Sequence, residues 1–151
     1  MTVDFPNKHF LINGEWVCSN TEIDLINPST GDVIAQVSEA NNEHVNDAVG
    51  VAKDTLENTW KNITARERST LLSTLGRLIE ENYDVLASLE ATDVGKPLRQ
   101  AQADVKALAR YMEFYAGAAD KLHGDTIPYL EDYTVYTLRE PHGVCAHIIP
   151  W

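Results

Sequence analysis

The C-terminal stretch Gly143-Val144-Cys145-Ala146-His147-Ile148-Ile149-Pro150-Trp151 decides the fold that we predict for this chain. It is a nearly continuous apolar run, which is typical of a strand buried on both faces of a parallel sheet. Two parallel strands can pair only across a crossover of a dozen or more residues, usually a helix. We therefore expect an α/β protein in which this run opens a nucleotide-binding sheet whose other strands lie outside the 151 residues.

Two β-hairpins are predicted at the opposite end of the chain. Residues 9–17 contain Asn13-Gly14 between apolar runs, which is the strongest short signal for a hairpin. Residues 23–37 contain the turn Asn27-Pro28-Ser29-Thr30-Gly31, where proline fixes one φ angle and glycine accepts a positive one. A further strand is expected over residues 133–139, which alternate in polarity.

Three amphipathic helical stretches are predicted between these β segments. The first begins near residues 41–42. The second begins with the capping box Thr64-Ala65-Arg66-Glu67, has a possible break at Asn82, and ends at Gly95. The third carries an apolar stripe that favours burial against a sheet over a coiled coil. The members of that stripe are Leu98, Ala101, Val105, Leu108, Met112, Tyr115, Ala119 and Leu122.

These helices present more apolar surface than the short predicted strands can cover. We therefore expect apolar side chains to remain exposed within the chain. Such a surface marks either a binding face or contact with a further part of the protein, and we favour the further part.

The composition limits the classes of partner and compartment. The net charge of −11 argues against nucleic acids and anionic membrane surfaces as partners. No apolar run reaches the roughly 18 residues of a transmembrane helix, and residues 1–8 lack the features of a secretory signal. Cys18 and Cys145 are far apart and fit a reducing compartment. We expect a cytoplasmic protein.

The usual catalytic patterns are sparse in this sequence. The five histidines lack the i, i+4 spacing that places two metal ligands on one helix face, and neither common glycine-rich phosphate loop occurs. Cys145 lies within the apolar run and is interpreted as an inert core thiol. The remaining candidate is the end of the last strand, residues 148–151, because ligands in open α/β sheets bind beyond the carboxyl ends of strands.

Seven short motifs follow one another along the chain. They are Phe10-Leu11-Ile12-Asn13-Gly14-Glu15-Trp16, Asn27-Pro28-Ser29-Thr30-Gly31, Arg66-Glu67-Arg68, Asp93-Val94-Gly95-Lys96-Pro97, Tyr115-Ala116-Gly117-Ala118-Ala119-Asp120-Lys121, Glu140-Pro141-His142-Gly143-Val144 and Ile148-Ile149-Pro150-Trp151. On these motifs the chain resembles the N-terminal third of the aldehyde dehydrogenase superfamily along essentially its whole length. It is most similar to the NAD(P)-dependent branch that oxidises free aldehydes to acids.

The resemblance implies an incomplete Rossmann-like coenzyme-binding domain of the aldehyde dehydrogenase fold, with N-terminal β-hairpins, three or four helices and part of an oligomerisation arm. Residues 1–123 would be the N-terminal part of the coenzyme-binding domain. Residues 124–141 would be part of the arm, which includes the strand expected over 133–139. Residues 142–151 would be the first strand of the Rossmann-like core. A homodimer or homotetramer is expected.

The resemblance also implies two sets of ligand-binding residues. Ile148, Ile149, Pro150 and Trp151 would lie against NAD or NADP, and the absence of a glycine-rich fingerprint is no objection in this family. The backbone carbonyls near Leu25 and Ile26, together with Asp93, would form part of a monovalent-cation site. Asp93 could instead cap the turn at Gly95, and Lys96 would face solvent or stabilise that turn.

The residues that carry out the family's chemistry are absent from this chain. In the complete enzyme a cysteine thiolate attacks the aldehyde, a thiohemiacetal loses hydride to NAD(P)⁺, and a glutamate-activated water releases the acid. Neither Cys18 nor Cys145 matches the nucleophile, and the oxyanion-stabilising asparagine would follow Trp151. We expect the chain alone to be inactive. Two alternatives remain, which are a short non-catalytic relative acting as an interaction or oligomerisation module, and a self-sufficient α+β domain.

Overall fold

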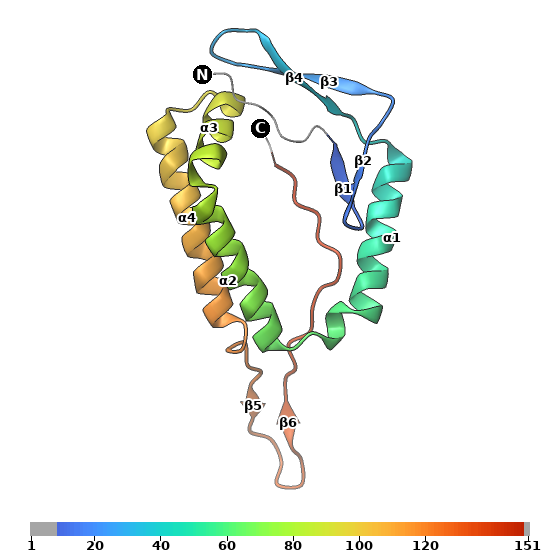
Figure 1. Cartoon of the computed structure of the whole chain (residues 1–151). Helices are drawn as coiled ribbons and strands as arrows, with labels where there is room; N and C mark the ends of the chain where they lie inside the picture. Colours follow the sequence, from blue (N-terminus) through green and yellow to red (C-terminus); the bar gives the residue numbers. More distant parts are fainter. Residues whose placement is uncertain (1–8, 150–151) are drawn as a thin grey trace.

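The structure is a computed structural model that describes residues 9–149. Along these residues, short antiparallel hairpins come before and after a set of helices (Figure 1). The elements are β1 (Phe10–Ile12), β2 (Glu15–Val17), β3 (Glu22–Ile26), β4 (Val33–Ser38), α1 (Asn42–Asn58), the 3₁₀-helix η1 (Trp60–Asn62), α2 (Ala65–Glu81), α3 (Tyr83–Val94), α4 (Leu98–Ala118), β5 (Thr126–Ile127) and β6 (Val135–Tyr136).

The first predicted hairpin is confirmed. Strands β1 and β2 pair antiparallel, with Phe10 opposite Val17. Asn13 and Gly14 connect them with φ angles of 54° and 79°. Two consecutive positive φ angles define a type I′ turn, whose twist matches that of the flanking strands.

The second predicted hairpin is also confirmed. The amide of Asn27 donates to the carbonyl of Asp32 across the loop (2.9 Å), and the amide of Gly31 donates to the carbonyl of Asn27 (2.8 Å). The side-chain oxygen of Asn27 accepts from the amide of Ser29 (2.9 Å), which forms an Asx turn. The pairing of β3 with β4 shifts register between Leu25 and Ile26.

The predicted helix starts are confirmed by their caps. The side chain of Asn41 accepts from the amide of His44, whose ring accepts in return from the amide of Asn41. Thr64 and Glu67 form the same reciprocal arrangement at the start of α2. Each pair satisfies two amides that a helix start would otherwise leave without partners. The break at Asn82 is real, since α2 ends there and α3 follows.

Helices α2, α3 and α4 pack into one layer that holds most of the buried residues. Helix α4 contacts α2 and α3 (Figure 1). The core cluster consists of Ile79, Ala87, Ala101, Val105 and Ala109. The prediction that the α4 stripe packs against a sheet is therefore wrong. Each described sheet has only two strands, whereas the neighbouring helices offer small residues that allow close packing.

The third helix and the following strand are shorter than predicted. Helix α4 ends at Ala118, because the amides of Ala119 and Lys121 form tight i→i−3 bonds that close the last turns. Only Val135–Tyr136 of the segment 133–139 is a strand, and it pairs with the two residues of β5. This hairpin extends from the base of the helical layer (Figure 1).

Residues 143–149 of the predicted Gly143–Trp151 strand are neither paired nor buried in the structure, and the partner strands were expected outside the 151 residues, so the strand in a larger sheet stays a prediction. Residues 137–149 form neither helix nor strand. Ile148 is 92% exposed and Ile149 is 61% exposed. Cys145, expected as a core thiol, is exposed. The physical reason is that no strand within residues 9–149 pairs with this segment, so its backbone groups have no ladder to join.

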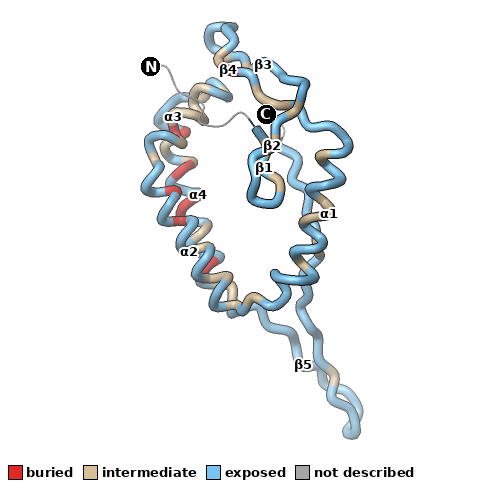
Figure 2. The backbone as a smooth tube through the Cα atoms, turned by 45° about the vertical axis from the view of Figure 1, so that its right-hand side comes forward, coloured by how far each residue is buried: buried red, intermediate tan, exposed pale blue. Residues whose placement is uncertain are grey.

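Apolar side chains remain exposed on the hairpins and on the helices, as predicted. Figure 2 shows the buried residues gathered along α2, α3 and α4, while α1 and the arm are exposed or half-buried. Among the described residues the core contains no large side chain that is fully buried. Exposed aromatic examples on one helix are Tyr111, Phe114 and Tyr115. Within residues 9–149, no helix combines the length and apolar character needed to cross a membrane.

Candidate functional site

The turn between α3 and α4 meets the loop of the second hairpin. Gly95 ends α3 in the left-handed conformation, with a φ angle of 71°. A Cβ atom on Gly95 would lie 2.6 Å from Cγ of Pro28 and 3.6 Å from Oγ of Ser29. Glycine is therefore required twice at this position, for the positive φ angle and for the close approach of the loop.

This contact links the two segments that carry the predicted cation-site residues. Leu25 and Ile26 end strand β3, and Pro28 follows them by two residues. Asp93 is an exposed residue of the last turn of α3 and precedes Gly95 by two residues. The structure thus joins segments that are almost seventy positions apart in the sequence.

The end of β3 is irregular at the predicted carbonyl donors. Leu25 pairs with Ala35, but Ile26 pairs with Val33, so Ile34 is the additional residue of a bulge. A bulge interrupts the regular ladder of hydrogen bonds at that point. Leu25 is half-buried and Ile26 is 55% exposed. Carbonyl and carboxylate oxygens are hard donors of the kind that alkali cations accept, so the residues fit the proposed group chemically.

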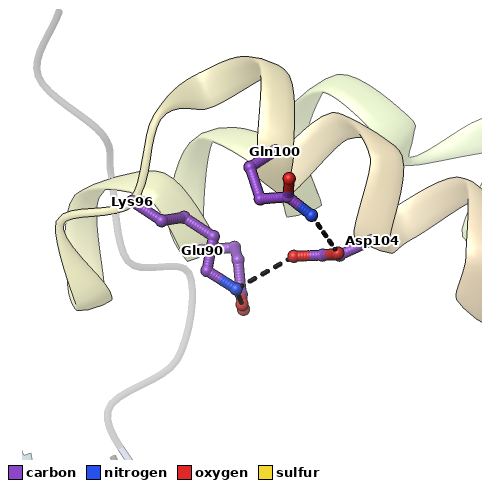
Figure 3. Close-up of polar contacts among 4 residues, drawn as sticks. All are labelled: Glu90, Lys96, Gln100 and Asp104. Atoms are coloured by element: carbon purple, nitrogen blue, oxygen red, sulfur yellow. Dashed lines mark hydrogen bonds and ion pairs between the residues drawn. The ribbon is translucent and has the colours of Figure 1, made fainter.

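Two ion pairs of Lys96 also fix this turn. The Lys96 ammonium bridges Glu90 of α3 and Oδ2 of Asp104 of α4, the latter at 3.0 Å (Figure 3). The other oxygen of Asp104 accepts from Nε2 of Gln100 at 2.9 Å. We call Glu90, Lys96 and Asp104 the turn clamp. Of the two roles foreseen for Lys96, facing solvent or stabilising the turn, the ion pairs favour stabilisation of the turn, and its side chain is 27% exposed.

Within the clamp, the contact between Lys96 and Asp104 favours the charged form of each. The hydrogen bonds to Glu90 and then to Asp104 raise the pKa of Lys96 above its ordinary value. The bonds from Lys96 and then from Gln100 lower the pKa of Asp104. Both shifts favour the ionised forms. A raised lysine pKa moves loss of the clamp to higher pH, and a lowered aspartate pKa moves it to lower pH.

The structure does not bring the predicted coenzyme residues to a formed site. Ile148 and Ile149 lie in the exposed terminal segment, and Pro150 and Trp151 lie outside the described residues. The same segment passes α1 at Gly143, where an added Cβ would lie 3.8 Å from Leu56. The role of these residues toward a coenzyme stays a prediction. Within residues 9–149, no group of three or more His, Cys, Asp or Glu side chains could hold a metal ion.

Sequence reasoning missed the carboxylates of the turn clamp. Glu90 precedes Lys96 by six positions and Asp104 follows it by eight, and both contacts join a helix to the turn between α3 and α4, so the i, i+3 and i, i+4 spacings of a single helix do not reveal them. The contact between Pro28 and Gly95 was missed for the same reason. The available signal was the motif Asp93-Val94-Gly95-Lys96-Pro97, in which a helix stop stands beside a charged residue.

Comparison with known proteins gives one consistent result. The model of the aldehyde dehydrogenase family matches residues 16–151. The chain is 42% identical to aldehyde dehydrogenase family 2 member B4, mitochondrial, of Arabidopsis thaliana, and 43% identical to mitochondrial aldehyde dehydrogenase of Rattus norvegicus. These alignments cover 99% and 97% of the chain but 29% of each relative. The chain therefore spans less than a third of the length of these curated relatives.

A solved structure shares the fold as well as the sequence. The NAD⁺ complex of an aldehyde dehydrogenase from Bacillus cereus superposes with a TM-score of 0.82 at 41% identity. The superposition covers 86% of this chain and 27% of that one. The α/β arrangement of hairpins, helices and arm is thus that of one part of a larger fold.

Proposed function

Because this chain belongs to the aldehyde dehydrogenase family, we propose that the complete protein oxidises an aldehyde to a carboxylic acid with NAD⁺ or NADP⁺. The observation that carries the proposal is the family match over residues 16–151, supported by a relative of known structure that binds NAD⁺. The coenzyme, when bound, accepts the hydride of the aldehyde. This chain supplies positions rather than reacting groups, since the family's catalytic Cys, Glu and Asn match none of its residues.

The chain's contribution to coenzyme binding is the segment Ile148–Trp151 in this proposal. Apolar side chains there would pack against the flat groups of the dinucleotide, and Pro150 would end the strand by withholding an amide donor. The exposure of Ile148 supports this view, because 92% of that side chain is free to be covered by a ligand or by neighbouring strands. Residues 142–151 would then become the first strand of the Rossmann-like core.

The chain's contribution to a monovalent-cation site is the carbonyls of Leu25 and Ile26 with the carboxylate of Asp93. Two observations support it, which are the bulge at the end of β3 and the contact of Pro28 with Gly95. The cation would supply a fixed positive charge between the hairpin and helix α3. Its oxygen-rich donor set favours an alkali ion over a soft transition metal.

The arm, residues 124–141, is proposed to join subunits into a homodimer or homotetramer. It extends from the helical layer (Figure 1), and its apolar side chains are uncovered. The exposed members are Ile127, Tyr129, Leu130, Tyr133, Tyr136 and Leu138. An exposed apolar hairpin of this kind is typical of an interface. The same observation favours a second candidate function, in which this chain is a non-catalytic module that docks on complete subunits.

Residues 1–123 are proposed as the N-terminal part of the coenzyme-binding domain. We also propose the cytoplasm as the compartment of the protein. The support is that Cys18 and Cys145 are both free and exposed, which suits a reducing environment.

The proposed activity is tested by purifying the complete protein and the 151-residue chain separately. Each is incubated with a panel of aliphatic and aromatic aldehydes and with NAD⁺ or NADP⁺, and reduced coenzyme is followed. We expect turnover by the complete protein and none by the chain alone. The proposal is wrong if the folded complete protein oxidises no aldehyde. Turnover by the chain alone would show that the reacting groups lie within these 151 residues, which contradicts our placement of the catalytic Cys, Glu and Asn outside them.

A further inference from the structure

Two different contacts hold the turn of residues 95–97. Gly95, which has no side chain, lies against Pro28. Lys96 joins the turn to the helical layer through Glu90 and Asp104 (Figure 3). Consecutive residues of one short turn therefore connect the second hairpin to helices α3 and α4.

The clamp gives the turn one position relative to both helices. Glu90 lies on α3 before the turn, and Asp104 lies on α4 after it. A single ammonium group that contacts both carboxylates restricts how the two helices can move about the turn. Asp104 is itself held by Gln100 one helical turn away. Charge-assisted bonds of this type are stronger than neutral ones and impose geometry.

The position of the turn affects how the predicted cation donors of β3 and of α3 lie relative to each other. Pro28 rests on Gly95, and the proline follows the carbonyl donors of β3 by two residues. Asp93 precedes Gly95 by two residues on the rigid end of α3. A shift of the turn would therefore move the Asp93 carboxylate relative to the β3 carbonyls, and these form the two halves of the site.

We propose that Lys96 is a positioning residue for the cation site, acting through the turn clamp rather than by touching the ion. The inference rests on the cation site given under the proposed function. Glu90 and Asp104 share this role, because each accepts a hydrogen bond from the Lys96 ammonium and so helps to fix its position. Loss of the clamp is expected to weaken cation binding while leaving the donor atoms themselves in place.

The test measures cation binding by the complete protein without using catalysis. Thermal unfolding is recorded over a range of KCl concentrations, with choline chloride keeping ionic strength constant. A ligand that binds only the folded state raises the melting temperature with its concentration. The stabilisation follows the logarithm of (1 + [K⁺]/Kd) and does not saturate, so each series is fitted for Kd. That K⁺ concentration, at which half of the folded protein is occupied, is called the midpoint and is compared between the wild-type protein and Lys96→Met. We expect the midpoint to increase by about twofold to fivefold, as for loss of a partly exposed ion pair.

Matched variants separate positioning from a general loss of stability. Lys61→Met removes the same group from an exposed ion pair with Glu57 in another part of the chain, and should leave the midpoint unchanged. Lys96→Arg can still bridge both carboxylates and should restore a midpoint near that of the wild type. If Lys96→Met does not fold, Glu90→Gln and Asp104→Asn weaken the clamp more gently and should raise the midpoint in the same direction.

The outcomes distinguish the inference from the proposal beneath it. A wild-type protein that K⁺ stabilises no better than choline would overturn the cation site, and the inference with it. A wild-type response with the same midpoint in Lys96→Met would overturn the inference alone. A lower melting temperature at every KCl concentration with an unmoved midpoint would mean that the clamp only stabilises the fold, which also contradicts the inference.

Discussion

Gly124 lies directly against the backbone of Thr137, where the two strands of the arm leave the helical layer. A Cβ atom on Gly124 would overlap the carbonyl oxygen of Thr137 and would lie 3.2 Å from its hydroxyl oxygen. The amide of Thr137 donates to the carbonyl of Asp125 at 2.9 Å, and the amide of Asp125 donates to the Thr137 hydroxyl at 2.8 Å. The base of the arm is therefore a closely packed pair of backbone segments that continues the antiparallel pairing of β5 with β6.

Gly124→Ala should force the backbone segments at Gly124 and Thr137 apart. Because the obstacle is backbone and cannot rotate away, we expect a loss of about 3 kcal/mol in the stability of the arm. If the arm joins subunits, the complete protein should also dissociate at a higher protein concentration, which analytical ultracentrifugation measures. Gly117→Ala is the control, since nothing lies within 4 Å of its added Cβ. An unchanged assembly in Gly124→Ala would contradict the view that close packing of Gly124 on Thr137 supports subunit association.

Gly76 is the second close approach, at the contact of α2 with α4. An added Cβ would lie 3.3 Å from Cβ of Met112 and 3.4 Å from the carbonyl oxygen of Ala109. Alanine gains about 1 kcal/mol of helix propensity over glycine, but overpacking costs about 1–3 kcal/mol. We expect Gly76→Ala to destabilise the complete protein by about 1 kcal/mol in urea denaturation.

The control for that variant is Gly50→Ala in α1, where the added Cβ meets open space. There only the propensity gain operates, so the same substitution should stabilise helix α1 by about 0.5–1 kcal/mol. Changes of the same sign at both positions would show that packing at Gly76 is looser than the structure indicates.

The cap of α2 should make the stability of that helix depend on acid pH. Hydrogen bonds from the Thr64 side chain and then from its amide lower the pKa of Glu67. A lowered carboxyl pKa gives stability that is present above the unfolded value and is lost as pH falls through the folded value. Amide protection at the start of α2 should therefore fall on acidification below about pH 4.5.

Thr64→Ala is expected to raise the pKa of Glu67 toward its ordinary value, which a carboxyl titration by NMR detects. Thr70→Ala is the matched control, because its hydroxyl donates to the carbonyl of Arg66 and does not touch Glu67. A Glu67 pKa that stays low in Thr64→Ala would mean that the backbone amide of residue 64 or the helix dipole, rather than the Thr64 hydroxyl, holds it down.

The chain expressed alone should behave as an incompletely covered fold. Phe114 is 63% exposed and Leu122 is 77% exposed, and the described core contains no fully buried large side chain. We expect binding of a hydrophobic dye and no sharp thermal transition. A cooperative, monomeric transition without dye binding would support the self-sufficient domain instead.

Local signals in the sequence predicted the fold well where they act over a few residues. The turn at Asn13-Gly14, the capping box of Thr64 with Glu67 and the helix stop at Gly95 each depend on backbone geometry within four positions. Each satisfies its own hydrogen bonds or φ angle locally. These features would therefore be present whatever surrounds them.

Predictions that depend on distant partners were less successful. The apolar run after Gly143 was expected to be a strand, yet strand formation needs a neighbour that residues 9–149 do not supply. The stripe of α4 indicated a buried face without specifying helices as the surface that covers it. The link between Pro28 and Gly95 was hidden for the same reason, since no periodicity joins positions so far apart.

The order in which this chain acquires structure follows from the layer of α2, α3 and α4. Its three helices follow one another within residues 65–118, so its contacts close shorter loops, and lose less loop entropy, than the contact between Pro28 and Gly95. During synthesis these helices can assemble as soon as they leave the ribosome, and the turn at Gly95 comes into being with them. The hairpin that carries Pro28 is synthesised earlier, but it can pack against Gly95 only after the turn of residues 95–97 has formed. The cation pocket would thus be completed by a late docking step.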